Sequence, residues 1–185
     1  MRKLVTIIAA LGACGPLARG AESHGFYVGA GADRVTVSPL PGSSTGYQAF
    51  IGYNFDRFLA IETDYLNIGN FNAAAASPYL GSSALGALSL SAEEVSALGK
   101  LPLTRRFELF ARLGGLYWRG QATVTVFSSG FPVFDTSVSN TGTTFVWGAG
   151  GQALFGPFTL RAEYQQTDIN GHLYRFAGGS LIYRF

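Results

Sequence analysis

The residues best suited to catalysis are the two histidines, because acyl transfer needs a nucleophilic serine beside a histidine base and a carboxylate that orients the base. His24 lies near the N-terminus, and His172 follows Asp168 by four positions. None of the three residues after His172 is a serine. We therefore expect His172 to be an exposed loop residue and the protein not to be an enzyme, with a lipid-modifying enzyme as the least favoured alternative.

Metal and nucleotide chemistry have no support in the sequence. No histidine pair or acidic cluster has the spacing of a metal site, and Cys14 is the one cysteine. The glycine-rich stretch GAGADR at 29–34 lies within an extended segment and opens no helix, so it does not fit a nucleotide-binding loop. We expect no metal and no cofactor.

Ion pairing inside the fold is the chemistry that the charged residues do support. A buried unpaired charge costs several kcal/mol, whereas in a buried ion pair the attraction roughly offsets the cost of desolvation. We expect the following residues to meet in one polar interior: Glu62, Lys100, Arg112, Gln152, Arg161 and Glu163. The first interpretation is a plug that fills the interior and fixes strand register. The alternative is a gated, low-conductance pore in which one arginine exchanges glutamate partners.

Eight segments with period-two alternation must position these residues. They are rich in Tyr, Phe, Val, Leu and Thr, and Gly, Pro, Asn, Asp and Ser clusters separate them. They span 26–37, 46–55, 58–67, 88–101, 107–119, 143–155, 158–167 and 173–185. Several reach the ~9 to 11 residues that a bilayer-crossing strand needs. No apolar run of about 18 residues follows the first twenty, so a membrane would be crossed by strands.

The connections alternate between tight turns and long segments. Turns are expected at 56–57, 103–106 and 156–157, and long loops at 38–45, 68–83 and 120–142, which is the pattern of an outer-membrane barrel. The fourth segment is ambiguous, because Ser91 and Glu94 have the spacing of a helix-capping box. We predict a strand there, because a single-chain barrel needs an even strand number, and allow a short loop helix at 73–88.

Alternation gives two faces without saying which is inside. A lipocalin-like soluble barrel would turn its apolar face inward, and a membrane barrel would reverse it. Aromatic residues at the strand ends, among them Tyr47, Tyr65 and Tyr183, favour two interfacial girdles. Glycines on the polar face, such as Gly29 and Gly52, would leave room for long charged side chains. We therefore predict an all-β fold, an eight-stranded antiparallel transmembrane β-barrel over residues 21–185.

Residues 1–20 read as a signal peptide, with Arg2 and Lys3 before an apolar run and small residues at Ala18 and Gly20. An alternative is lipidation at Cys14, which follows Leu11-Gly12-Ala13. Removing the signal's three basic residues from 13 leaves 10 against 11 acidic residues, a net charge of −1. This balance does not indicate nucleic-acid binding.

The stretches ELFARLGGLYWRGQ (108–121), LRAEYQQTD (160–168) and SLIYRF (180–185) resemble the barrel domain of outer membrane protein A and its small relatives. GFYVGAGA from residue 25 and IGYNFD from residue 51 fit the first two strands. The resemblance implies an integral protein of the Gram-negative outer membrane, with an interior of paired acids and bases to which Glu62, Arg112 and Glu163 correspond. Leu98 replaces an interior lysine of the relatives, and the chain ends without their peptidoglycan-binding domain.

The resemblance also implies partners. We expect outer-membrane lipid and lipopolysaccharide around the barrel, and insertion by the barrel-assembly machinery through a C-terminal signal formed by Leu181, Tyr183 and Phe185. The segment FSSGFPVFDTSV at 127–138 is apolar enough to contact an extracellular partner. The function we expect is structural or surface-interacting (adhesin-like), with the small pore second and a lipid-modifying outer-membrane enzyme third.

Overall fold

The computed structural model describes residues 24–38, 43–77, 82–128 and 131–185. Its elements are eight strands, which confirms the all-β prediction: β1 (Gly25–Ser38), β2 (Ser44–Asn54), β3 (Leu59–Ser77), β4 (Ser82–Pro102), β5 (Phe107–Ser128), β6 (Phe131–Phe155), β7 (Phe158–Ile169) and β8 (His172–Arg184). Among these residues, no helix is long and apolar enough to cross a membrane. The predicted signal peptide and Cys14 lie outside the described residues.

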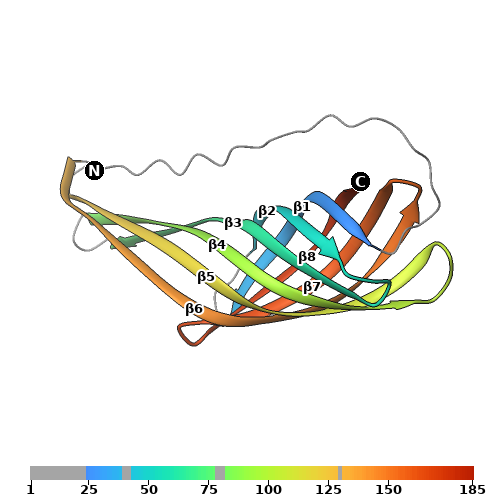
Figure 1. Ribbon diagram of the computed structural model, residues 1–185. Helices are drawn as coiled ribbons and strands as arrows, with labels where there is room; N and C mark the ends of the chain where they lie inside the picture. Colours follow the sequence, from blue (N-terminus) through green and yellow to red (C-terminus); the bar gives the residue numbers. More distant parts are fainter. Residues whose placement is uncertain (1–23, 39–42, 78–81, 129–130) are drawn as a thin grey trace.

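The strands form a closed antiparallel barrel in which each pairs with its neighbour in sequence and β8 closes on β1 (Figure 1). At the seam, Val28 is opposite Tyr183 and Ala30 is opposite Leu181. The amide of Phe185 donates to the carbonyl of Phe26 over 3.1 Å, so the chain end is held by the first strand. Closure gives every strand a partner on both sides over the barrel, as lipid requires.

The apolar face points outward, as the membrane interpretation predicts. On β7, Leu160 is 54% exposed, whereas its neighbours Thr159 and Arg161 are buried. Phe107, Leu113 and Leu181 are exposed in the same way on β5 and β8. In water such an exterior would be unfavourable, but against hydrocarbon it is the expected surface of a transmembrane barrel.

Two predicted long loops are wrong. Residues 68–77 continue β3 and residues 82–87 begin β4, so neither a loop over 68–83 nor a helix over 73–88 forms. Likewise, 120–128 continue β5 and 131–142 belong to β6. The predicted partner loop at 127–138 is therefore strand in its described part. The alternation of Thr and Val at 123–126 is a strand pattern that the surrounding Gly and Ser residues obscured.

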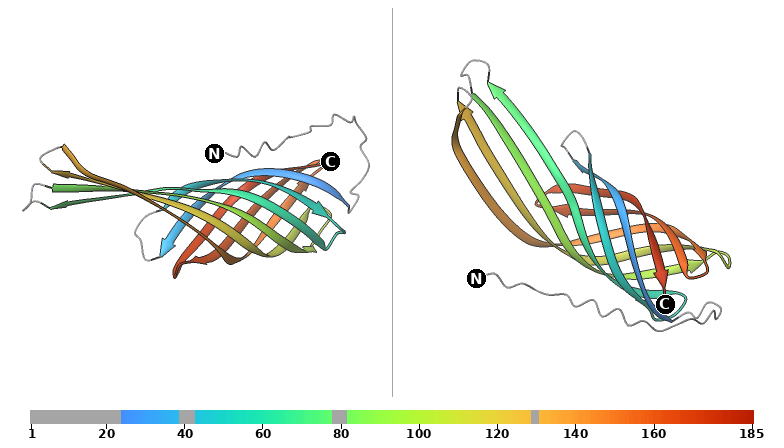
Figure 2. Two further views of the ribbon diagram at one scale, coloured as in Figure 1. Left: turned by 60° about the vertical axis from the view of Figure 1, so that its left-hand side comes forward. Right: turned by 90° about the horizontal axis from the view of Figure 1, so that it is seen from above.

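These extensions form a four-stranded sheet, β3–β4–β5–β6, that projects well beyond the barrel wall (Figure 2). A register shift between Asn67 and Gly69 marks where β3 leaves the barrel. Gly69 has a φ of +97°, and its amide donates to Asn67 Oδ1 over 3.0 Å. A glycine is favoured at this bulge because an L side chain rarely adopts that φ.

The ambiguous fourth segment is a strand throughout 88–101. Its capping-box residues Ser91 and Glu94 pair with Arg119 and Leu116 of β5. Tertiary hydrogen bonding on both sides of β4 overrides the local helix propensity, because a strand missing from this position would leave both β3 and β5 unpaired in lipid.

Candidate functional site

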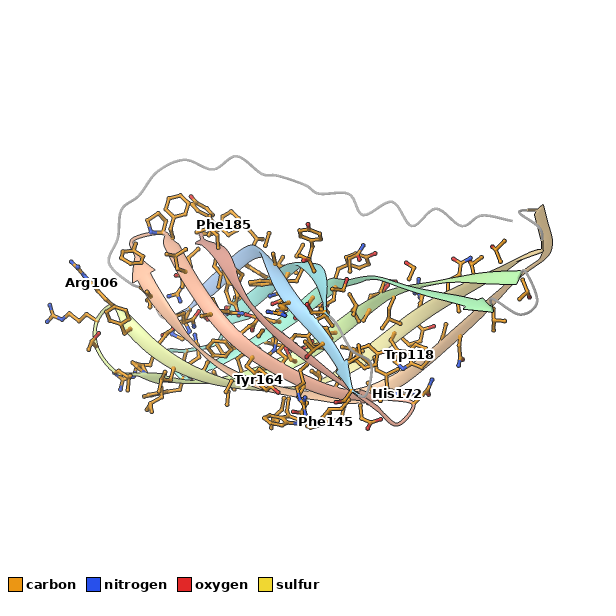
Figure 3. All side chains as sticks on the ribbon, turned by 180° about the vertical axis from the view of Figure 1, so that it is seen from behind. Arg106, Trp118, Phe145, Tyr164, His172 and Phe185 are labelled. Atoms are coloured by element: carbon orange, nitrogen blue, oxygen red, sulfur yellow. The ribbon has the colours of Figure 1, made fainter. Side chains whose placement is uncertain are left out.

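The lumen is arranged in layers that can be followed along β5. The buried side chains on its inward face are those of Glu108, Phe110, Arg112, Leu116 and Trp118. Phe185 and Arg106 lie at the end of the barrel with the tight turns, and Trp118 and His172 lie at the end from which the sheet projects (Figure 3). In barrels of this kind the short turns face the periplasm, so the charged middle layer has an apolar layer on its extracellular side.

The centre of the charged layer is Arg112, which is 1% exposed. Its Nη2 atom lies 2.8 Å from Asp64 Oδ2, 2.9 Å from Glu94 Oε1 and 3.4 Å from Glu62 Oε2. Its Nη1 lies 3.2 Å from Glu163 Oε2. One guanidinium thus faces four carboxylates, which come from β3, β4 and β7.

Arg161 on β7 is the second buried arginine of this layer. It donates to Glu62 in bidentate geometry, from Nη1 to Oε2 over 2.9 Å and from Nη2 to Oε1 over 2.7 Å. Its guanidinium carbon also lies 5.0 Å and 4.8 Å from the ring centroids of Phe50 and Phe110. The planar cation is therefore held by a carboxylate at its edge and by aromatic rings, a site that lysine would fill poorly.

Lumen glycines make room for the rings around Arg161. A Cβ added to Gly29 would overlap the Phe50 ring, and one added to Gly150 would meet the Phe110 ring. At Gly52 the added atom would overlap Tyr27, whose hydroxyl donates to Glu62 Oε1 over 2.6 Å. The predicted use of the glycines was space for charged side chains, and the structure uses that space mainly for aromatic rings beside the charges.

Four of the predicted network residues are brought together: Glu62, Arg112, Arg161 and Glu163. Gln152 borders them, because Arg161 Nε donates to its Oε1 over 3.4 Å and its own amide donates to Glu108. Lys100 does not reach the Arg112 cluster. It lies nearer the periplasmic end and donates to Asn54 Oδ1 over 2.6 Å. Ser96 and Leu98 occupy the inward positions of β4 between Glu94 and Lys100, which explains the separation.

Sequence reasoning left Asp64 and Glu94 out of the network. Asp64 has the same strand parity as Glu62, and Glu94 has the same parity as Lys100. The shared parity was sufficient to predict that both side chains face the lumen. Glu94 was instead interpreted through its helix-capping spacing with Ser91.

An apolar layer closes the extracellular half of the lumen. Its inward side chains are contributed by seven of the eight strands: Val35, Val37, Leu66, Ile68, Leu90, Ala92, Leu116, Trp118, Val146, Ile169, Tyr174 and Phe176. All are buried against one another. Such a layer resists the passage of hydrated ions, because it offers no hydrogen bonds to replace their water.

The periplasmic half is also filled. Arg184 pairs with Glu108 over 3.1 Å, and the space between Lys100, Arg161 and Arg184 leaves no room for a water-sized molecule. The described lumen is therefore a solid core of ionic and apolar layers in this conformation.

The C-terminal strand has the predicted orientation. Leu181, Tyr183 and Phe185 are exposed on the outer wall, and Ser180 and Ile182 are buried in the lumen. Tyr183 packs edge-on against Phe158 and Phe185, with ring centroids 5.5 Å and 5.2 Å apart. Recognition of these residues by insertion machinery stays a prediction.

His172 begins β8 at the extracellular rim. The nearby carboxylate of Asp168 accepts a hydrogen bond from the Gly171 amide over 2.8 Å, and the Asp168 carbonyl accepts one from Thr144 Oγ1 over 2.6 Å. These contacts assign Asp168 a role in shaping the turn between β7 and β8.

Residues 22–176 match the model of the OmpA-like transmembrane domain family. Outer membrane protein A of Escherichia coli O157:H7 is 28% identical over 134 residues, which are 72% of this chain and 35% of that protein. Outer membrane protein A of Klebsiella aerogenes is 31% identical over 88 residues, 48% of this chain and 23% of that protein. The chain thus spans about a third or less of the length of these relatives.

Solved structures with a similar fold are small outer-membrane barrels. OprG of Pseudomonas aeruginosa gives a TM-score of 0.60 at 11% identity, covering 90% of this chain and 98% of that one. Ail, the attachment invasion locus protein of Yersinia pestis, gives 0.57 at 17% identity, covering 88% and 97%. Neisserial surface protein A gives 0.57 at 18% identity, covering 86% and 97%.

Proposed function

The chain belongs to the OmpA-like transmembrane domain family of outer-membrane β-barrels, and on this premise we propose that it is a surface-interaction barrel with a closed lumen. The observation that carries the proposal is the sheet of β3 to β6, which projects from the extracellular end (Figure 2). A barrel that only sealed or anchored itself in the membrane would need none of this sheet.

The projecting sheet has an exposed edge suited to binding. Among the described residues, β7 pairs with β6 only from Val146 to Phe155, and side-chain hydrogen bonds join it to Thr144 and Phe145, so residues 136–143 of β6 have β5 on one side and no strand on the other. This edge is rich in Ser and Thr and carries no charge from 136 to 143, and Asp135 precedes this stretch. A free edge with an uncharged stretch of this length favours pairing with an extended segment of another protein.

A gated pore is the second candidate, and the surplus of carboxylates around Arg112 favours it. Four acids around one guanidinium offer alternative partners at similar distances. Opening would nevertheless have to displace the apolar layer around Leu116 and Trp118 as well as the ion pairs, so the closed barrel is supported better.

The proposal is tested by adding charge to the edge. Ser139→Lys with Thr141→Lys should abolish attachment of expressing cells to host-cell or matrix proteins, because lysines on an edge strand oppose strand addition. Gln121→Lys is the matched control, since Gln121 is the cross-strand partner of Ser139 on the interior strand β5. If cells with the wild type, with the double lysine variant, with Gln121→Lys and without the protein all attached equally, the proposed function would be excluded.

A further inference from the structure

Two arginines project from the outer wall of the barrel on adjacent strands. Arg34 on β1 and Arg175 on β8 are both exposed and occupy outward positions of their strands. Thr36 is opposite Arg175 and Arg34 is opposite Ala177, so the two arginines are diagonal neighbours. Diagonal neighbours of this kind lie roughly 7–8 Å apart, within the reach of two guanidinium groups around one anion.

Among the described residues, ion pairing sets these two arginines apart from Arg119. In the part of the chain that the structure describes, no carboxylate forms an ion pair with Arg34 or Arg175. Arg119 provides a contrast, because it is also exposed but lies 3.4 Å from Glu93. The wall at β1 and β8 therefore carries two positive charges without an ion pair among the described residues, with the exposed carboxylate Asp168 as a diagonal neighbour of Arg175 on β7.

The height of these charges follows from the strands. Arg34 is nine positions after Gly25, where β1 begins, and Arg175 is nine positions before Arg184, where β8 ends. At ~3.3 Å per residue and a tilt of about 40°, both lie roughly 23 Å above the periplasmic end of the barrel. The apolar band of such barrels is about 25 Å tall. The two backbone positions are consequently near the upper edge of the apolar band, from which long arginine side chains reach the outer-leaflet headgroups.

The wall beneath them suits acyl chains. The outward residues between the arginines and the periplasmic end are apolar, and those nearest to the arginines are small: Ala30, Ala32, Ala177 and Gly179. Ala32 and Gly179 are directly opposite each other. A flat strip of this kind allows hydrocarbon chains to lie close to the backbone directly below a charged headgroup.

Further hydrogen-bond donors border the pair. Gln166 is the cross-strand partner of Arg175 on β7, and its Oε1 accepts a hydrogen bond from Tyr164 over 3.2 Å. This contact directs the amide carbonyl toward Tyr164, whose side chain lies on the outer wall (Figure 3), and leaves the amide NH₂ as a donor. The site thus presents hydrogen-bond donors suited to phosphate oxygens, which act as acceptors.

We infer that Arg34 and Arg175 form a binding site for the phosphate of a phosphorylated glycolipid in the outer leaflet, the chemical class of lipopolysaccharide. A phosphate monoester matches two guanidinium groups in charge and geometry. A lipid fits better than a soluble anion, because the apolar strip continues below the charges. The site lies on the barrel wall and is independent of the projecting sheet.

Binding of defined lipids to the detergent-solubilised full-length barrel tests the inference by native mass spectrometry. The probes are diphosphoryl lipid A and the same lipid A without its phosphates. The wild type should retain the phosphorylated lipid at least about tenfold better. Arg34→Gln with Arg175→Gln should lose this preference, and Arg119→Gln, the matched control, should keep it. Millimolar inorganic phosphate should not displace the lipid.

Three outcomes would overturn the inference: equal retention of both lipids by the wild type, an unchanged preference in the Gln double variant, or displacement by inorganic phosphate. Heat-modifiable migration on a gel checks folding of each variant. If the Gln variant does not fold, Arg34→Lys with Arg175→Lys replaces it as a variant that retains both charges. The preference of the wild type for the phosphorylated lipid then still tests the inference. Lysines in place of Ser139 and Thr141 should leave lipid binding unchanged, which separates this site from the surface-interaction role.

Discussion

Arg161 and Glu62 are joined by two parallel hydrogen bonds of 2.9 Å and 2.7 Å, with both side chains almost fully buried in the lumen. The pair links β7 to β3 across the interior of the barrel, between strands that are not neighbours. It therefore ties together opposite parts of the wall, which backbone hydrogen bonds between adjacent strands cannot do.

Removing one partner of this pair should destabilise the barrel. Glu62→Ala leaves the guanidinium of Arg161 without its bidentate acceptor, and loss of a buried partner costs about 3–5 kcal/mol. Glu62→Leu combined with Arg161→Met should cost less than Glu62→Ala, because no charge is then left unpaired. Urea unfolding in lipid vesicles, followed by gel mobility, measures both. A double variant as unstable as the sum of its single variants would contradict this account.

The carboxylates around Arg112 should respond unequally to neutralisation. Glu94→Gln removes one of four negative charges near a single guanidinium, so we expect a change below about 1 kcal/mol or a gain in stability. Arg112→Met leaves Asp64, Glu94 and Glu163 facing one another and should cost at least about 3 kcal/mol. The same urea titration compares the two variants. A larger loss for Glu94→Gln than for Arg112→Met would show that the four contacts are not in surplus.

The sequence was sufficient to predict the closed barrel from its eight alternating segments, and the aromatic strand ends and the glycines of the polar face were sufficient to orient its two faces. Parity on each strand also indicated Glu62, Arg112, Arg161 and Glu163. Which acids contact which arginine depends on the stagger between distant strands, and alternation contains no information about it. The separation of Lys100 from the Arg112 cluster is an example.

The projecting sheet was missed for a different reason. Residues 68–83 are dominated by Ala, Ser, Gly and Asn, which have weak strand propensity, so local preference indicated a loop. In the folded chain the described part of this stretch gains its structure from pairing, because β3 pairs with β4 from Gly69 to Ser77. Cross-strand hydrogen bonding of this kind cannot be deduced from one segment at a time.

The wild-type barrel should show no ion conductance in planar-bilayer recordings, and Glu62→Ala should show none either. The reason is that the apolar layer of Leu116, Trp118 and their neighbours stays closed when the ion pairs beneath it are weakened. Leu116→Ala with Trp118→Ala should produce small conductance steps, because water can then enter the layer. Conductance in Glu62→Ala alone would instead favour the gated pore.

The turn between β2 and β3 should show a pH-dependent contribution to stability. The Asp56 carboxylate accepts hydrogen bonds from the amides of Phe58 and Leu59 over 2.6 Å and 2.7 Å. These bonds favour the charged form and lower the pKa of Asp56 below its ordinary value of 3.8. A carboxyl whose pKa is lowered on folding stabilises the fold above its unfolded pKa, and this stabilisation is lost as the pH falls through the folded pKa.

Titration of Asp56 by NMR in detergent micelles measures this pKa directly, and Asp56→Asn is the matched variant. The variant should be less stable than the wild type at neutral pH, and the difference should shrink as the pH falls toward the pKa of Asp56. A pKa at or above 3.8 would show that the turn amides do not stabilise the carboxylate.

A methyl group added to a lumen glycine should destabilise the barrel, whereas one added to an outer-wall glycine should have little effect. Gly52→Ala places a Cβ against the Tyr27 ring, which is fixed by its hydrogen bond to Glu62. Overpacking of this kind typically costs about 1–3 kcal/mol. Gly99→Ala is the matched control, because a Cβ there meets nothing within 4 Å, so we expect a change within about 0.5 kcal/mol. Unfolding midpoints in urea compare the two variants. Equal losses of stability would show that the lumen accommodates an added methyl group as easily as the outer wall does.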